Sequence, residues 1–332
     1  MNLTLTGPLF RLLTAKRRLE VKWQGEVLAS IPLKMVERVV LLGPAQVSAA
    51  AALILMQARI PVLFCSSRGN YYGMLSPGYE DVEFLLLQVE RYRDEGFRLN
   101  IAKAIVSAKI KHKQRLLRRY ARNHPNPNLT QTAQEMNRLL NSLSIRSSVP
   151  EVMGIEGQAS ALYFSAFGQC LRQEGITFTE RNRHPPKDPV NALLSLGYML
   201  VLGEVVGALM AQGLHIGLGF LHEVSRRRPA LALDLLELAR QPIVDRLTLS
   251  LFNLNVFKAD DFDGQPNGAV RLKEKSLKRY LQYYERTMTT PFRYGNGGQT
   301  GTFRDYLKEQ AAGLKKAVQE NNPTWTPTVL QL

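Results

Sequence analysis

Hydrophobic and polar positions follow one pattern in the first 80 residues and another in the rest of the chain. Near the N-terminus, short apolar or alternating runs are separated by turn signals such as Gly7-Pro8. These runs predict strands at Phe10–Leu13, Leu19–Trp23, Val27–Ala29, Val36–Leu42, Ile60–Phe64 and Tyr71–Leu75. The Ala/Leu-rich segment Ala49–Ala58 predicts a helix, and Ser48 is placed to cap it. The pattern therefore predicts a small β-rich domain that carries one helix.

Beyond Ser76-Pro77-Gly78, the best linker candidate, apolar residues recur at helical spacing almost to the end. They predict one or two helices within Phe84–Ala121, and further helices at Thr130–Ser144, Gly154–Arg172, Val190–Leu214, Pro229–Arg240, Leu272–Thr287 and Thr302–Glu320. Glycines predict a flexible loop at Gly295–Gly301, and we expect the last dozen residues to be poorly ordered. The predicted fold class is α+β, with a small β-rich, β-sandwich-like domain at 1–80 and a larger all-α domain at 81–332.

The segment Val190–Leu214 is long and apolar enough to span a membrane. Its only formal charge, Glu204, falls near the centre, where an acidic side chain costs about 2.5–3.5 kcal/mol. The basic residues that flank the segment show no clear asymmetry between its two sides. We interpret it as a buried core helix of a protein without a membrane partner, and a membrane-associated basic protein is the alternative.

Composition and charge narrow the possible functions. The chain has 332 residues, of which 45% are hydrophobic, and this excludes a disordered polycation. Its 43 Lys+Arg against 28 Asp+Glu give a formal net charge of +15, which favours a polyanion or an acidic membrane surface as partner. Two cysteines, Cys65 and Cys170, are too few for a disulfide framework. They indicate buried thiols in a reducing compartment, so we expect a cytoplasmic location.

Much of the positive charge lies in one acid-free stretch. Its eight basic residues are Lys103, Lys109, Lys111, Lys113, Arg115, Arg118, Arg119 and Arg122. A solvated helix face usually mixes signs, because acids offset the repulsion between bases. The stretch therefore favours contact with nucleic-acid phosphates, while an ordinary exposed helix and a membrane-surface helix remain alternatives. The residues expected to bind DNA here are Lys109, Lys111, Lys113 and Arg115.

A few acidic residues run against this basic trend. Asp234 and Glu237 are three residues apart and share one face of a predicted helix, with His222 just upstream and Glu156 in another helix. An imidazole combined with carboxylates suits Mn²⁺ or Mg²⁺, which can activate a nucleophile for in-line displacement at a phosphodiester. From the residues alone, a helix N-terminal role for Glu156 and a solvated face for the other two acids stay open.

Three ordered blocks then resemble a known family. They are Gly154–Ala159 with Tyr163-Phe164, Arg181–Ser195, and Gly213–His222 followed by Leu233–Glu237. Together they resemble the CRISPR-associated integrase of the adaptation module, the larger of the two Cas proteins that acquire new spacers. The resemblance covers nearly the whole chain, and the β-rich start is similar as well.

The resemblance implies a divalent-metal-dependent DNA endonuclease and integrase. In the integration step, a 3′-hydroxyl of a captured DNA fragment attacks a phosphodiester at the CRISPR repeat boundary. The implied ligands of Mn²⁺ or Mg²⁺ are Glu156, His222 and Glu237, and Asp234 is expected near the metal or supporting its ligands, so we expect catalysis to depend on all four. The remaining residues expected to bind DNA are Arg181, Arg183, Arg226 and Arg227.

The resemblance also implies an assembly. Its members are a homodimer formed through the β-rich domains, a small ferredoxin-like Cas partner that bridges two such dimers, double-stranded DNA with single-stranded ends, and CRISPR repeat DNA. Only some protomers of such an assembly perform chemistry. The alternative function is therefore a non-catalytic, basic DNA-binding scaffold.

Overall fold

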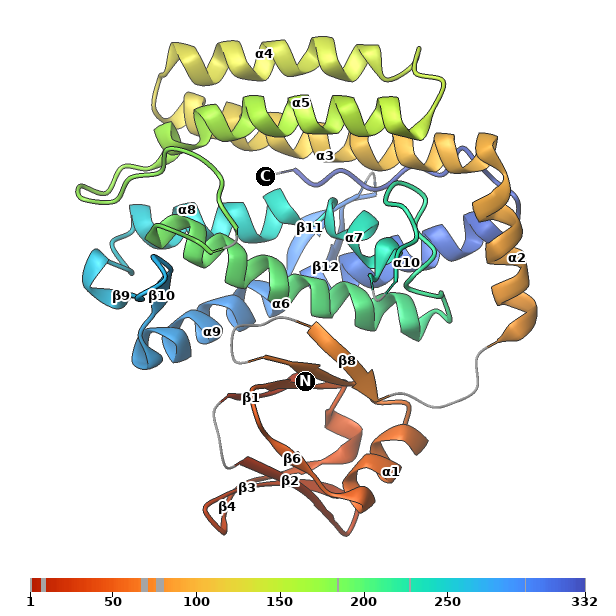
Figure 1. The fold of residues 1–332 in the computed structure, drawn as a ribbon, viewed down its shortest axis with the longest axis vertical. Helices are drawn as coiled ribbons and strands as arrows, with labels where there is room; N and C mark the ends of the chain where they lie inside the picture. The colour runs from red at the N-terminus through yellow and green to blue at the C-terminus, as the bar shows by residue number, and fades with distance from the viewer. Residues whose placement is uncertain are drawn as a thin grey trace. The chain divides into compact units, whose positions relative to one another are not determined.

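The computed structural model describes residues 2–6, 10–66, 71–75, 81–183, 185–226, 228–295 and 297–331. The chain divides into two compact units, Met1–Asp81 and Val82–Leu332. In Figure 1 the first unit runs from red to orange, and the second continues from orange to blue. The linker candidate Ser76-Pro77-Gly78 and the turn at Gly7-Pro8 lie outside the described residues.

The first unit holds two four-stranded sheets and the helix α1 (Ala49–Gln57). One sheet has the order β1-β5-β7-β8, in which only β8 is antiparallel to its neighbour. The other has the order β4-β3-β2-β6, an antiparallel meander to which β6 adds in parallel. The strands are β1 (Asn2–Thr6), β2 (Phe10–Ala15), β3 (Arg18–Trp23), β4 (Glu26–Pro32), β5 (Arg38–Leu42), β6 (Gln46–Val47), β7 (Val62–Cys65) and β8 (Tyr71–Leu75).

Local patterns explain these elements. Strand β3 buries Leu19 and Val21 and turns the residues between and beside them outward, as the two-residue period of a strand requires. Strand β5 lies between β1 and β7 and is buried along its whole length, which is typical of a central parallel strand. The Ser48 hydroxyl accepts a hydrogen bond from the Ala51 amide at 3.1 Å and caps α1 as expected.

The second unit is mostly helical, and together with the first it confirms the α+β fold class. Its helices are α2 (Val82–Arg93), α3 (Glu95–Asn123), α4 (Pro127–Ser142), α5 (Val149–Phe167), α6 (Pro189–Ala211), α7 (Ala230–Leu236), α8 (Arg246–Asn253), α9 (Glu274–Thr289) and α10 (Phe303–Gln319). Figure 1 shows α3, α4 and α5 lying alongside one another. The segment Arg240–Asp245 between α7 and α8 is a π-helix. Helices α2 and α3 are separate because Asp94 caps α3 by accepting a hydrogen bond from the Phe97 amide.

The prediction of an all-α second domain needs one correction. Among the described residues of this unit, two short antiparallel hairpins interrupt the helices, β9 (Phe262–Gly264) with β10 (Val270–Leu272), and β11 (Phe292–Tyr294) with β12 (Gln299–Gly301). Within the glycine-rich segment predicted as a flexible loop, Gln299–Gly301 forms the second strand of the β11–β12 hairpin. Gly295 and Gly298 adopt φ values of 73° and 63° there, a conformation that favours glycine. Strands of three residues are too short to produce an alternating pattern.

Helix α6 is a core helix whose central acid is paired inside the protein. Within the described residues it alone is long and apolar enough to cross a membrane, yet 61% of its most apolar 18-residue window is buried. The Glu204 carboxylate accepts hydrogen bonds at 3.1 and 3.3 Å from Arg304 of α10. The same guanidinium also binds Glu285 of α9. This ion-pair network holds α6, α9 and α10 together.

The C-terminal segment is docked against α3, contrary to the expectation of poor order. Arg115 of α3 donates hydrogen bonds at 2.6 Å to the carbonyls of Val329 and Leu330. The Leu330 amide donates to Nε2 of the buried His112 at 2.9 Å, and burial lowers the pKa of this imidazole to about 3. Figure 1 shows the segment running along α3. The polar side chains of α3 therefore provide the partners that order the tail.

We predict that Arg304→Met lowers the free energy of unfolding of the second unit by about 3–5 kcal/mol, because it removes the arginine from a buried carboxylate. Urea denaturation followed by helical circular dichroism measures this change. The matched control is Lys316→Met on the same helix, whose exposed ammonium lies 3.7 Å from Glu320 and should contribute about 0–1 kcal/mol. Equal losses in the two variants would contradict the prediction.

Candidate functional site

Two of the expected acidic residues meet at one lysine. The Lys109 ammonium, in the middle of α3, contacts Oε1 of Glu156 on α5 and Oε2 of Glu237 immediately after α7. These three side chains are 7%, 23% and 6% exposed. Helices α3 and α5 pack against each other, which brings residues 47 positions apart into contact. The site is therefore assembled from three separate segments of the second unit.

The register between α3 and α5 pairs polar side chains twice. Four residues after Lys109, the Lys113 ammonium donates to the Ser160 hydroxyl at 2.6 Å, and this hydroxyl donates to Glu156 Oε1 at 2.6 Å. Residues four apart lie on one helix face, so each helix presents two polar groups to the other. The paired faces allow charged groups to be buried between apolar neighbours.

Nearby cations keep both carboxylates ionised. Burial by itself raises the pKa of Glu237, but Arg240 and Lys109 outweigh this effect and hold the pKa well below its ordinary value. Burial likewise raises the pKa of Glu156, and Lys109 and Lys113 lower it below its ordinary value. The fully buried Lys113 has a pKa well below the usual lysine value, because of desolvation and the neighbouring Lys109. Both glutamates are thus anionic near neutral pH.

Asp234 fixes His222 and the loop that carries it. The carboxylate of Asp234 accepts backbone hydrogen bonds from Phe220, Leu221 and His222 at 2.6 to 2.9 Å, and it lies 2.7 Å from Nδ1 of the His222 ring. Because Nδ1 is engaged, Nε2 is the ring nitrogen that remains for another ligand. His222 also contributes to the lowered pKa of Glu237, so the two side chains lie within electrostatic range.

Gly219 is required by the close packing of this loop. A Cβ atom there would lie 2.7 Å from the His222 carbonyl oxygen and 2.8 Å from the backbone of Ala230. Any side chain would push the loop away from α7, where Asp234 lies. The absence of a side chain at Gly219 therefore allows the loop to pack closely against the start of α7, which brings Asp234 to His222.

The structure thus brings the four expected residues together as two pairs. Glu156 and Glu237 meet at Lys109, and Asp234 contacts His222. Among the residues that it describes, no three His, Cys, Asp or Glu side chains form a ready metal-binding group. The Lys109 ammonium lies between the two glutamates instead. The donor chemistry nevertheless fits a divalent cation, since two ionised carboxylates converge on one positive charge beside a loop that carries an imidazole. Both carboxylate oxygens of Asp234 are engaged by the loop backbone and the His222 ring.

Sequence reasoning missed a further carboxylate, Asp245, behind the site. Its oxygens accept hydrogen bonds from the hydroxyls of Tyr163 and Tyr198, and burial raises the pKa of this carboxyl. Arg240 links Asp245 and its partners to the site, because its guanidinium lies 4.5 Å from the Tyr198 ring centroid and its Nε lies 3.2 Å from Glu237 Oε2. Both Arg240 and Asp245 belong to the π-helical segment, so a search for α-helical spacing does not find them.

The basic residues of α3 do not form one exposed face. Lys109 and Lys113 are buried against the carboxylates, and Arg115 binds the C-terminal carbonyls. Lys111 is half-buried, while Arg118 and Arg122 are exposed. The reason is that α3 packs against α4, α5 and the π-helical segment, so most of its circumference is covered. The positions of Lys109, Lys113 and Arg115 give no support to DNA binding by these three residues.

The remaining arginines expected to bind DNA have different surroundings. Arg181 donates to Asn191 Oδ1 at 2.6 Å and to Ser195 Oγ at 3.1 Å, and so ties its loop to α6. Arg183 and Arg226 are exposed, and Arg227 lies outside the described residues. Arg183 and Arg226 are therefore free to meet a ligand from solvent.

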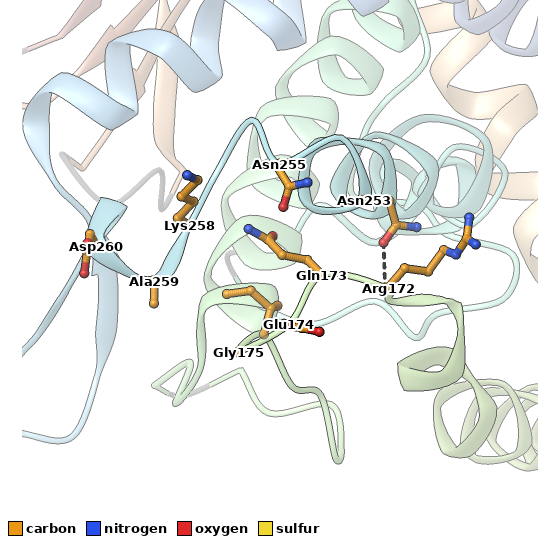
Figure 2. Close-up of a pocket in the computed structure, with 10 residues that line it drawn as sticks. Arg172, Gln173, Glu174, Gly175, Asn253, Asn255, Lys258, Ala259 and Asp260 are labelled. Atoms are coloured by element: carbon orange, nitrogen blue, oxygen red, sulfur yellow. Dashed lines mark hydrogen bonds between the residues drawn. The ribbon is translucent and has the colours of Figure 1, made fainter.

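A separate polar hollow of about 520 Å³ lies between the segment after α5 and the end of α8 (Figure 2). A hydrogen bond of 2.9 Å from the Arg172 amide to Asn253 Oδ1 joins the two segments. The lining mixes two basic and two acidic side chains with amides, and it includes none of the residues expected to act. The candidate site is thus the carboxylate cluster and not this hollow.

Comparison with known proteins adds independent findings. Residues 3–286 match the protein family described as CRISPR associated protein Cas1. A Thermus thermophilus protein named CRISPR-associated endonuclease Cas1 3 is 33% identical over 306 residues, which are 91% of this chain and 88% of that protein.

Solved structures agree with this match. The structure of a CAS1 protein from Thermotoga maritima superposes with a TM-score of 0.82 and 25% identity, over 96% of this chain and 97% of that one. A chain of a Cas6-RT-Cas1–Cas2 complex superposes with a TM-score of 0.84 and 26% identity. The match covers 98% of the present chain but only 36% of the longer chain in that complex.

We predict a specific pH dependence from the lowered pKa of Glu237. Its folded-state pKa lies below its unfolded value, so the stabilisation is present above the unfolded pKa and is lost as the pH falls toward the folded one. Between about pH 5 and pH 3, thermal melts of the wild type should therefore lose more stability than those of Glu237→Gln. The control Glu274→Gln, at an 84% exposed side chain, should follow the wild type. Parallel curves for all three proteins would refute the prediction.

Proposed function

The chain belongs to the Cas1 family of CRISPR-associated proteins, and from this premise we propose that it is a divalent-metal-dependent DNA endonuclease and integrase. The observation that carries the proposal is the convergence of the Glu156 and Glu237 carboxylates beside a loop on which Asp234 orients His222. The presence of all these groups favours catalysis over the scaffold role.

Glu156, Glu237 and the Nε2 atom of His222 would hold Mg²⁺ or Mn²⁺. Bound there, the ion would supply a positive charge that activates a hydroxyl and stabilises the leaving oxygen of a phosphodiester. The chain's own residues preorganise this site. Asp234 sets the orientation of His222, and Arg240 holds Glu237 through a contact of 3.2 Å.

The proposed reaction is a transesterification. A 3′-hydroxyl of a captured DNA fragment attacks a phosphorus atom at the boundary of a CRISPR repeat. The new bond joins that 3′-oxygen to phosphorus, and the bond from the same phosphorus to the 3′-oxygen of the target strand breaks. The proton lost by the attacking hydroxyl is balanced by the proton gained on the released 3′-hydroxyl, so the number of phosphodiester bonds does not change. With water as the nucleophile, the same site would act as an endonuclease. The likeness to named Cas1 endonucleases supports this assignment.

The proposed partners are double-stranded DNA with single-stranded ends, repeat DNA, a second copy of the chain and a small ferredoxin-like Cas protein. The similarity to a Cas1-containing chain from a complex with Cas2 supports the last of these. In the first unit, Val27, Leu28 and Leu53 are each about half exposed, which favours a homodimer through that unit. We expect the exposed basic residues of the second unit to contact DNA phosphates.

We predict that Glu237→Gln reduces strand transfer into a repeat-containing plasmid by at least about 100-fold, equivalent to about 2.7 kcal/mol of transition-state stabilisation. The substitution keeps the shape of the side chain and removes the charge that would hold the metal. The assay contains Mn²⁺ or Mg²⁺ and the small Cas partner, and Glu274→Gln is the control. Joining of DNA ends by Glu237→Gln at the wild-type rate would remove the catalytic assignment.

We predict that Arg183→Gln and Arg226→Gln each weaken DNA binding about equally for all sequences. Each variant should also reduce the slope of log affinity against log salt by about 1, because one phosphate contact is lost. Fluorescence anisotropy with two unrelated duplexes at several salt concentrations measures both effects. Lys275→Gln, at an exposed position of α9, is the control. An unchanged salt slope in both arginine variants, or selective loss on one duplex, would count against phosphate contact.

A further inference from the structure

The two proposed carboxylate ligands share one resident cation. The Lys109 ammonium contacts both Glu156 Oε1 and Glu237 Oε2, and its side chain is only 7% exposed. The neighbouring Lys113 is held differently, because its direct partner is the Ser160 hydroxyl at 2.6 Å. Lys109 is therefore the side chain that bridges the two carboxylates.

This bridge has an electrostatic reason. The Glu156 and Glu237 side chains are 23% and 6% exposed, and burying two carboxylates without a counter-cation is strongly unfavourable. The Lys109 ammonium supplies the compensating charge, and it does so at the same oxygens that a metal would need. A lysine ammonium is a compact charge on a flexible four-carbon stem, so it can leave without a movement of α3.

We propose that Lys109 is an internal counter-cation that competes with the divalent metal for Glu156 and Glu237, and that its displacement sets the metal affinity of the site. The inference rests on the proposed function, because it takes these glutamates as metal ligands. A dication and the ammonium repel each other at shared oxygens, so only one of them can occupy the site. Metal binding then requires the lysine to leave, which reduces the apparent affinity by the fraction of molecules whose site is open.

The first test measures Mn²⁺ binding to the full chain by calorimetry. Lys109→Met keeps the length of the side chain and removes the charge, and we expect it to bind Mn²⁺ at least about tenfold more tightly than the wild type. The matched control is Lys113→Met, which removes a buried amine held by Ser160 and should tighten binding by less than about threefold. Equal or weaker Mn²⁺ binding by Lys109→Met would overturn the proposal.

Thermal melts give a second readout on the same variants. Without metal, Lys109→Met should melt below the wild type, because the two carboxylates lose their shared cation. Added Mn²⁺ should then raise the melting temperature of Lys109→Met more than that of the wild type, since the stabilisation by a bound ligand increases with the logarithm of its affinity. A smaller shift in the variant would contradict the competition.

The wild-type protein provides a test that needs no folded variant. An amine-reactive reagent with detection by mass spectrometry reports the exposure of each lysine. Saturation with Mn²⁺ should increase the labelling of Lys109 several-fold and leave the exposed Lys275 unchanged. Unchanged labelling of Lys109 at Mn²⁺ concentrations that calorimetry shows to be saturating would overturn the proposal.

The variant Glu237→Gln separates failure of this inference from failure of the proposed function. If the wild type binds Mn²⁺ and Glu237→Gln binds it more weakly, the proposed ligand is supported, and the Lys109 variants then decide the inference alone. If Glu237→Gln binds Mn²⁺ as the wild type does, the proposed metal site fails and the inference fails with it.

Discussion

The contact between α3 and α5 is the constraint on which the site depends. It places Lys109 against Glu156 and Lys113 against Ser160 in a single register, and so carries ionised groups into an otherwise apolar interior. Such groups are tolerated there only as a paired set. A shift of either helix would leave a buried charge without its partner. The pairing therefore fixes the helix register and, with it, the position at which the carboxylates converge.

The other parts of the site are attached to this pair by polar contacts from separate segments. Asp234 closes the loop before α7 around His222, and Arg240 ties Glu237 to the π-helical segment and to Asp245 beyond it. Each contact uses a side chain that does not itself need to touch DNA or metal. Family membership supports a functional role for this arrangement, because the same groups in an unrelated fold could serve stability alone.

The basic side chains of the chain have two kinds of surroundings, the protein interior and the solvent. The net charge of +15 indicates a polyanionic partner, but part of the basic α3 stretch neutralises buried carboxylates or binds the C-terminal carbonyls. Arg183 and Arg226 keep their exposure and are the better candidates for phosphate contact. A run of like charges is thus insufficient to locate a DNA-binding surface, because helix packing decides which members reach solvent.

The sequence by itself determined the α+β class and most helices and strands, and it supplied Glu156, His222, Asp234 and Glu237 as candidates for the site. Local periodicity, capping and ordered motifs are properties of neighbouring residues, so they are readable along the chain. The tertiary structure alone decided that Lys109 joins two carboxylates, that Asp234 orients His222, and that two short hairpins and a docked tail belong to the second unit. These outcomes depend on which distant segments pack together, because packing determines burial and burial determines which charges must be paired.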